Sequence, residues 1–132
     1  MIRELRVALT VQDFDAALHV FRDLLGLETL QEWRNPDGRG AILAVGRATL
    51  ELFDAAQAAS VDHIEAGARL SGVVRLALEV EDLEYAARSF ARAGTKAVAQ
   101  PRLTPWGDRN QRLQTPEGLQ ITLFVPSEGR GA

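Results

Sequence analysis

The sequence predicts a single α+β domain built from two tandem βαβββ modules. The first observation behind this prediction is an internal repeat, because RVALTVQD at residues 6–13 returns as RLALEVED at residues 75–82. The second is a shared order of patterns, since each copy has an alternating stretch, then helical spacing, then three more strand-like stretches. The predicted division of the chain is module one at 1–53, a connector at 54–71, module two at 72–126 and a tail at 127–132.

The repeat extends well beyond those first eight residues. Residues 6–21 align with residues 75–90 without a gap and are identical at seven of sixteen positions. Farther along, LELF at residues 50–53 corresponds to ITLF at residues 121–124. Two matches in the same order indicate duplication of one unit rather than chance similarity.

In module one, residues 3–11 alternate apolar and polar side chains, which predicts the first strand. Asp13 is a candidate N-cap for a helix whose apolar positions begin at Phe14 and end at Leu25, and Gly26 suits the end of that helix. Further strands are expected near residues 27–33, 41–46 and 48–53, with NPDGRG as a hairpin turn between the first two.

Module two is expected to repeat this order, starting with a strand at residues 73–80. Asp82 is the candidate N-cap of its helix, which is predicted over residues 83–93 and ends at Gly94. The connector is rich in alanine and small polar residues, and we expect the tail to be frayed. The remaining strands are expected near residues 96–103, 109–114 and 119–125, with TPEG as the last turn.

Composition and charge exclude several classes of function. The net charge is −3 and the pI is near 5.4, so the chain lacks the basic surface expected of a protein that binds nucleic acid or an anionic membrane. Zero cysteines exclude disulfides and thiolate chemistry. No apolar run is long enough to span a bilayer and the N-terminus does not resemble a signal peptide, so we expect a cytoplasmic protein.

Strand parity predicts which side chains face the cavity, because successive side chains of a strand point to opposite faces. We expect one face to pack under the helices, namely Leu5, Val7, Leu9 and Val11 in module one and Val74, Leu76, Leu78 and Val80 in module two. The opposite face then carries Arg6 and Arg75, together with Glu51, Phe53, Thr122 and Phe124 of the last strands. This mixture is typical of a cavity wall, although an ordinary solvent-exposed sheet face is the alternative.

The tandem pattern, with VQDFDAALHVFRDLLGLE, LELF, LALEVEDLEYAARSFARAG and PWGDRNQRLQTPEGLQITLFVP, resembles the vicinal oxygen chelate superfamily. That superfamily contains glyoxalase I, bleomycin-resistance proteins, fosfomycin-resistance enzymes and extradiol dioxygenases. The resemblance covers residues 2–126 and implies that the two modules form curved mixed sheets around a cup-shaped cavity. It does not imply one reaction, because this scaffold hosts many chemistries. Because members often pair, it also implies a homodimer.

The resemblance further implies four metal-ligand positions in the metal-dependent members, usually His or Gln, then Glu, His and Glu. Here these positions are Arg6, Glu51, Arg75 and Thr122, and only Glu51 keeps a ligand type. An arginine stays protonated and has no lone pair for a metal, so we expect no metal and no other cofactor.

Instead, Arg6, Glu51 and Arg75 are expected to converge at the floor of the cup, leaving about one positive charge uncompensated. In one interpretation, a ligand carboxylate, phenolate or polarised carbonyl accepts the arginine donors. In the other, Arg6 pairs with Glu51 and Arg75 pairs with Glu79 or water, so that the cavity binds no ligand. Beside two arginines the pKa of Glu51 is expected to fall, which would make it a weak general base.

Aromatic side chains favour a planar ligand. Phe53 and Phe124 are expected to point into the cup, and Trp33 and Trp106 are expected at its rim, where they would stack on a flat ring. Both tryptophans also admit a structural interpretation, in which they cover the sheet. The complete set of candidate ligand-binding residues is Arg6, Glu51, Arg75, Thr122, Phe53, Phe124, Trp33 and Trp106.

The leading hypothesis is a metal-free protein that sequesters or carries a small, partly planar molecule, such as an antibiotic or natural product. One alternative is a metal-independent lyase, isomerase or hydrolase with Glu51 as base and the arginines as oxyanion stabilisers. Others are a glyoxalase-like or dioxygenase-like metalloenzyme with a non-standard site, or a vestigial cup in a protein that works through an interface.

Overall fold

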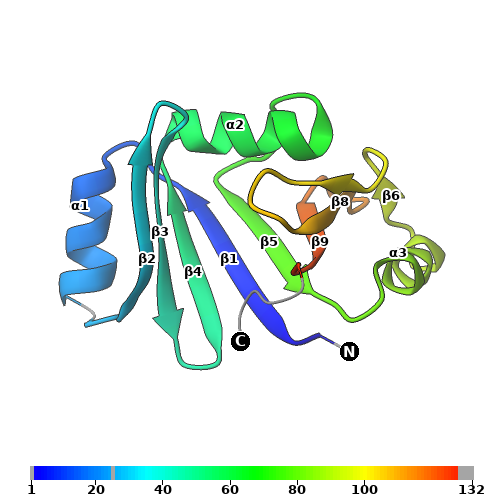
Figure 1. Cartoon of the computed structure of the whole chain (residues 1–132), viewed down its shortest axis with the longest axis horizontal. Helices are drawn as coiled ribbons and strands as arrows, with labels where there is room; N and C mark the ends of the chain where they lie inside the picture. The colour runs from blue at the N-terminus through cyan, green and yellow to red at the C-terminus, as the bar shows by residue number, and fades with distance from the viewer. Residues whose placement is uncertain (1, 25, 128–132) are drawn as a thin grey trace.

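The computed structural model describes residues 2–24 and 26–127, so the predictions for Leu25 and for most of the tail lie outside the described residues. The described elements form one mixed sheet with helices packed against it (Figure 1). In chain order they are β1 (Glu4–Thr10), α1 (Phe14–Leu18), the π-helical turn η1 (His19–Leu24), β2 (Thr29–Asn35), β3 (Gly38–Val45), β4 (Ala48–Phe53), α2 (Ala55–Ala66), β5 (Val74–Glu79), α3 (Leu83–Arg92), β6 (Lys96–Ala97), β7 (Arg102–Leu103), β8 (Arg109–Gln114) and β9 (Gln120–Val125).

The order of strands in the sheet follows the sequence repeat. It runs β2-β3-β4-β1-β5-β9-β8-β6, with β7 also paired to β8. In each half the first strand lies parallel to the last, β1 to β4 and β5 to β9, and the two halves join through the antiparallel pair β1 and β5. The fold is therefore α+β with a βαβββ-like order of elements in each half.

The capping predictions agree with the structure at both repeated helices. The carboxylate of Asp13 accepts a hydrogen bond from the Ala16 amide, and that of Asp82 accepts one from the Tyr85 amide. The helix of module one, however, is α-helical only as far as Leu18 and continues as the π-helical turn η1.

Other boundaries differ from those expected. The strand expected at 96–103 is two short strands, β6 and β7, that pair separately with β8. Strand β3 begins at Gly38, so the GRG of NPDGRG belongs to the strand and the turn is confined to residues 36 and 37. The connector contains the 12-residue helix α2, which Asp54 caps at its start and Gly67, with φ of 77°, ends.

Two apolar cores lie on the face of the sheet that α1 and α3 cover. Val7 and Leu9 pack with Phe14 and Leu18 of α1, and Leu78 and Val80 pack in the core beneath α3. The parity prediction is correct for these residues but wrong at the strand ends, where Leu5 is 37% and Val74 is 40% exposed. Leu5 is opposite Leu78 and Val74 is opposite Leu9 in the β1–β5 pair, so the two exposed residues lie beside residues of the cores.

A third, smaller core lies on the opposite face of the sheet. There Ala8 and Phe53 pack against Ala58 and Val61 of α2, with Trp33 beside them. Helix α2 contacts β3 and β4 in one half and β8 in the other, and Figure 1 shows it crossing the upper end of the sheet. No helix in the described part of the chain is long and apolar enough to cross a membrane.

Candidate ligand-binding site

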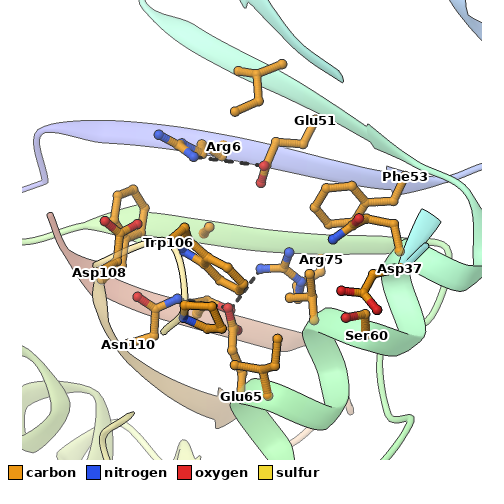
Figure 2. Close-up of a pocket in the computed structure, with 18 of the residues that line it drawn as sticks. Arg6, Asp37, Glu51, Phe53, Ser60, Glu65, Arg75, Trp106, Asp108 and Asn110 are labelled. Carbon is orange, nitrogen blue, oxygen red and sulfur yellow. Dashed lines mark hydrogen bonds and ion pairs between the residues drawn. The ribbon is translucent and has the colours of Figure 1, made fainter. Parts of the chain in front are cut away.

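A pocket of about 340 Å³ lies between the arginine-bearing face of the sheet, helix α2 and the loop before β8. Its volume is at the lower end of the range for small-molecule sites. Figure 2 shows side chains from these separate elements facing one space. All eight residues singled out from the sequence line this pocket: Arg6, Trp33, Glu51, Phe53, Arg75, Trp106, Thr122 and Phe124.

The register of the central strands brings the two arginines to one face. Arg6 of β1 is opposite Ala77 of β5, and Arg75 is opposite Ala8, so the arginines are diagonal neighbours across the antiparallel pair. The small alanines between them leave room above the strands. The strand register therefore places both arginines on the lining of one pocket, as the sequence predicted.

Arg6 has a carboxylate partner that the sequence argument did not foresee. Its Nε donates to Glu4 Oε2 at 2.7 Å, while its Nη1 lies 3.9 Å from Glu51 Oε2. The Thr49 hydroxyl donates to the same Glu4 oxygen at 2.7 Å. Burial alone would lower the pKa of Arg6, but the bond to Glu4 and the charge of Glu51 raise it above its ordinary value. The expectation that Glu51 is the only carboxylate beside the two arginines is therefore wrong, since Glu4 pairs with Arg6.

Arg75 is buried and has a different partner. The residue is only 5% exposed, and its Nη1 donates to Thr122 Oγ1 at 2.8 Å. The guanidinium carbon is 5.9 Å from the centre of the Phe53 ring. Among the described residues no carboxylate lies within 4.0 Å of the Arg75 guanidinium, so the pairing with Glu79 considered above does not occur.

Thr122 connects Arg75 to a buried carboxylate on helix α2. The Thr122 hydroxyl donates to Glu65 Oε1 at 2.6 Å. Glu65 also accepts from Arg112 Nε at 3.2 Å and Nη2 at 3.1 Å, and its Oε2 accepts from Asn110 Nδ2 at 2.8 Å. Sequence reasoning missed Glu65, Arg112 and Asn110. The sequence of β8 gave no signal for Arg112 and Asn110, because five of its six residues are polar and no apolar alternation marks a buried face.

The buried charges under α2 extend to Asp62. Arg112 is fully buried and its Nη1 donates to Asp62 Oδ1 at 2.8 Å. Asp62 also accepts hydrogen bonds from Arg69 and from the backbone and hydroxyl of Ser71. Burial alone would raise the pKa of Asp62, but the hydrogen bonds from Ser71, Arg112 and Arg69 hold it well below the ordinary value. This network fixes α2 to β8 and to the segment that leads into β5.

The expectation that the pKa of Glu51 falls, which would make it a weak base, is wrong. The residue is 7% exposed, and burial raises the pKa of its carboxyl above the ordinary value, because the charges of Arg75 and Arg6 offset only part of the desolvation. The arginines were expected to dominate. They do not, since Arg6 is held chiefly by Glu4 and no ion pair with Arg75 forms within 4.0 Å in the described structure.

Trp33 is held firmly and contributes to the fold as well as to the pocket wall. Its Nε1 donates to Gln57 Oε1 at 3.0 Å, and its ring meets Phe53 edge-on with centroids 6.2 Å apart. The ring lies against the backbone of Gly40, where an added Cβ would come within 2.0 Å of Trp33 Cζ2. The structural interpretation of Trp33 therefore applies, and the residue lines the pocket at the same time.

Trp106 stands on a closed loop at the pocket mouth and is 38% exposed. The Thr104 amide donates to the Asp108 carbonyl at 2.8 Å, and the Gly107 amide donates to the Thr104 carbonyl at 3.0 Å. These bonds order the loop around the indole. An exposed indole on an ordered loop is suited to stack on a ligand ring.

Residues 5–123 match the family model described as Glyoxalase/Bleomycin resistance protein/Dioxygenase superfamily. The chain belongs to this superfamily. The resemblance inferred from the repeat is confirmed, and the pocket occupies the face on which the superfamily's metal-dependent members were expected to bind a metal.

Solved structures support the same fold at low sequence identity. A hypothetical protein BH1468 from Bacillus halodurans C-125 has 16% identity and a TM-score of 0.68, over 100% of this chain and 98% of that one. A Streptomyces coelicolor methylmalonyl-CoA epimerase variant in complex with 2-nitronate-propionyl-CoA has 22% identity and a TM-score of 0.64, over 97% and 95%. The methylmalonyl-CoA epimerase of Mycobacterium tuberculosis has 22% and 0.61, over 96% and 87%. No protein of curated function matches the chain in sequence.

The donor set at the superfamily's metal positions does not fit a metal ion. Two of the four positions are guanidinium groups, which offer hydrogens and no lone pair, and a third, Thr122, accepts from Arg75 and donates to Glu65. Within residues 2–24 and 26–127 no cluster of three or more metal-ligating side chains is arranged to hold an ion. The chemistry of this pocket is therefore that of arginine donors, one raised-pKa carboxyl and aromatic faces.

Proposed function

We propose that this chain is a metal-free binding protein of the glyoxalase/bleomycin-resistance type that sequesters or carries a small, partly planar organic molecule. The observation that carries this proposal is Arg75, a buried residue of the pocket lining whose guanidinium gives one hydrogen bond to Thr122. A ligand oxygen in the pocket would accept hydrogen bonds from the guanidinium donors that Thr122 does not use, and hydrogen bonds from a charged donor are the stronger kind. Antibiotics and other natural products with flat rings and oxygen substituents fit this description.

The aromatic residues supply the second half of the recognition. Trp106 is exposed at the mouth on an ordered loop, while Phe53 and Phe124 are buried deeper in the wall. A ring held by Trp106 would place an oxygen substituent toward Arg75, as the side chains in Figure 2 are disposed. The homodimer implied by the resemblance remains part of this proposal.

Matched planar probes test the proposal. We expect 2-acetylnaphthalene and 2-naphthoate to bind more tightly than 2-ethylnaphthalene, which has the shape of the ketone but no oxygen. Arg75→Met and Arg75→Ala should weaken binding of the two oxygen-bearing probes by about 10- to 150-fold, the loss of a hydrogen bond to a charged group, and leave 2-ethylnaphthalene unchanged. Equilibrium dialysis measures all three affinities.

The control is Arg88→Ala, which removes an arginine from the outside of α3, away from the pocket lining. It should change none of the three affinities. Equal binding of the ketone and the hydrocarbon by the unmodified protein would contradict the proposal, as would an Arg75 variant that keeps the difference between them.

A second candidate function is favoured by the raised pKa of Glu51. Burial raises the pKa of the Glu51 carboxyl, and a carboxylate with a raised pKa is a stronger base than an ordinary glutamate. With Arg75 stabilising a developing oxyanion, Glu51 would remove a proton from the carbon next to a carbonyl, as a metal-independent lyase or isomerase requires. Two of the structural neighbours above are named as epimerases, a likeness that extends to the fold alone.

Deuterium exchange distinguishes this enzyme from a binding protein. In D₂O, an enzyme of this kind should exchange the methyl hydrogens of 2-acetylnaphthalene for deuterium, which proton NMR follows directly. Glu51→Gln should lower the exchange rate by on the order of 100-fold or more while the ketone still binds. Binding without exchange above the rate in buffer would reject the enzymatic function and leave sequestration.

A further inference from the structure

The hydrogen bonds between Arg75, Thr122 and Glu65 have a fixed direction. A guanidinium only donates, so Thr122 Oγ1 must accept from Arg75 Nη1 across their 2.8 Å separation. The single hydroxyl hydrogen of Thr122 is then left for Glu65 Oε1, which is 2.6 Å away. Because the Thr122 hydroxyl donates its hydrogen bond to Glu65, a lone pair of the Thr122 oxygen points toward Arg75.

Glu65 is itself held so that it does not move toward Arg75. Its Oε1 accepts from Arg112 Nε and Nη2, and its Oε2 accepts from Asn110. Glu65 is 3% exposed and Arg112 is 0% exposed, so both are removed from solvent competition. The carboxylate therefore has a fixed position on α2 and faces Arg75 through the threonine.

The repeat shows what is unusual in this arrangement. The position equivalent to Thr122 in module one is Glu51, a carboxylate on the last strand itself. In module two the strand supplies a hydroxyl, and the carboxylate comes from Glu65 of α2, 57 residues away in sequence from Thr122. A direct carboxylate pair would occupy two donors of Arg75. One hydroxyl occupies a single donor, so the other donors of this pocket-lining arginine remain for a ligand.

We propose that Glu65, acting through Thr122, is a positioning residue that aims the Arg75 guanidinium into the ligand pocket. The inference rests on the proposed function, since it concerns how the same pocket recognises an oxygen atom. Its consequence is that ligand selectivity depends on a helix lying outside both repeats. Neither Glu65 nor Thr122 needs to touch the ligand for this effect.

The test measures carbonyl preference, defined as the affinity for 2-acetylnaphthalene divided by that for 2-ethylnaphthalene. Thr122→Val keeps the shape of the side chain and removes the hydroxyl, and we expect it to lower this preference about two- to tenfold. Thr122→Ser restores the hydroxyl and should restore the preference. A role confined to folding would weaken both probes alike and leave the ratio unchanged.

Glu65 is tested by a double-mutant cycle. Glu65→Gln removes the charge and should lower carbonyl preference in the unmodified protein. In the Thr122→Val background it should have no further effect, because the hydroxyl through which Glu65 acts is gone. Thermal unfolding of each variant, with Thr122→Ser as the folded reference, shows that the ratios come from folded protein.

The outcomes separate this inference from the function on which it rests. If the unmodified protein shows no carbonyl preference, or if Arg75→Met keeps it, the proposed recognition by Arg75 fails and this inference fails with it. If Arg75→Met abolishes the preference but Thr122→Val leaves it intact, only the positioning role fails. Additive effects of Glu65→Gln and Thr122→Val would likewise reject the action of Glu65 through the threonine.

Discussion

Arg6 and Arg75 occupy equivalent positions of the repeat, yet their side chains have different surroundings. Two residues before Arg6 lies Glu4, whose carboxylate binds the guanidinium at 2.7 Å. The equivalent position before Arg75 is Val73, which has no polar group to offer. One arginine is therefore neutralised by its own strand, whereas the other is held by a hydroxyl and faces the pocket.

Gly40 shows how a single missing side chain shapes the pocket wall. The Trp33 ring lies against its backbone, and a Cβ there would meet Cζ2 at 2.0 Å. We expect Gly40→Ala to push the indole out of place and to lower the free energy of unfolding by about 1–3 kcal/mol, measured by urea denaturation. Gly72→Ala is the matched control, because nothing lies within 4 Å of an added Cβ at that position. Equal losses in the two variants would contradict this packing.

Helix α2 is the element that turns an open sheet face into a pocket. Its N-terminus is fixed by Asp54, which accepts from the Gln57 amide at 2.8 Å and from the Arg39 amide of β3 at 3.0 Å. Its C-terminal half is fixed by Asp62 and Glu65, which both bind Arg112 of β8. The helix thereby joins the two halves of the fold and brings the carboxylate of Glu65 to the pocket lining.

Loss of the Asp62 carboxylate should loosen α2. Asp62→Asn leaves Arg112 and Arg69 with a neutral partner, and we expect the free energy of unfolding to fall by about 3 kcal/mol, because breaking a buried ion pair leaves a charge uncompensated. Urea denaturation at pH 7 measures this difference. Asp37→Asn is the control, since Asp37 lies exposed in the β2–β3 turn.

The pH dependence of that difference follows from the lowered pKa of Asp62. Burial alone would raise this pKa, but hydrogen bonds led by those from Ser71 hold it below the ordinary aspartate value of 3.8. Stability from such a group is complete above the unfolded-state pKa and is lost as the pH falls below it. The gap between the unmodified protein and Asp62→Asn should stay constant from about pH 7 to 5 and narrow below about pH 4. A gap independent of pH down to 2 would contradict the ion pair.

The whole molecule is arranged about the antiparallel pair β1 and β5, which relates the two halves. Each half contributes an arginine from its first strand and a side chain from its last strand to one pocket. The two halves of the sheet have similar backbones but different side chains at this point, because module one provides Glu51 where module two provides Thr122. The pocket belongs to both halves and would not exist in either.

The protein as a whole should not require a metal ion to bind its ligand. Two of the four positions that the resemblance assigns to metal ligands carry guanidinium groups, which have no lone pair for a metal ion. We expect dialysis against a chelator to leave the affinity for 2-acetylnaphthalene unchanged, and elemental analysis before dialysis to find less than one equivalent of metal. A full equivalent retained through dialysis, or lost together with binding, would overturn this expectation.

Local sequence patterns predict much of this architecture. Alternation along 5–11 and 74–80 places Arg6 and Arg75 on one face, because the period of a strand is fixed by its backbone. The repeat then indicates that both strands hold the same place in two equivalent units. All eight candidate pocket residues were accessible to this reasoning, although their binding of a ligand remains a prediction.

What local patterns did not supply was the set of partners. Glu65 lies 57 residues from Thr122 in sequence, in a stretch whose alanine-rich composition favours a helix but does not show that the helix packs across the pocket. The raised pKa of Glu51 depends on how much water reaches its carboxyl, which burial by several distant strands determines. Periodicity constrains the direction of a side chain along its own strand. Contacts between distant segments, and the desolvation that accompanies them, arise when the sheet and α2 pack together.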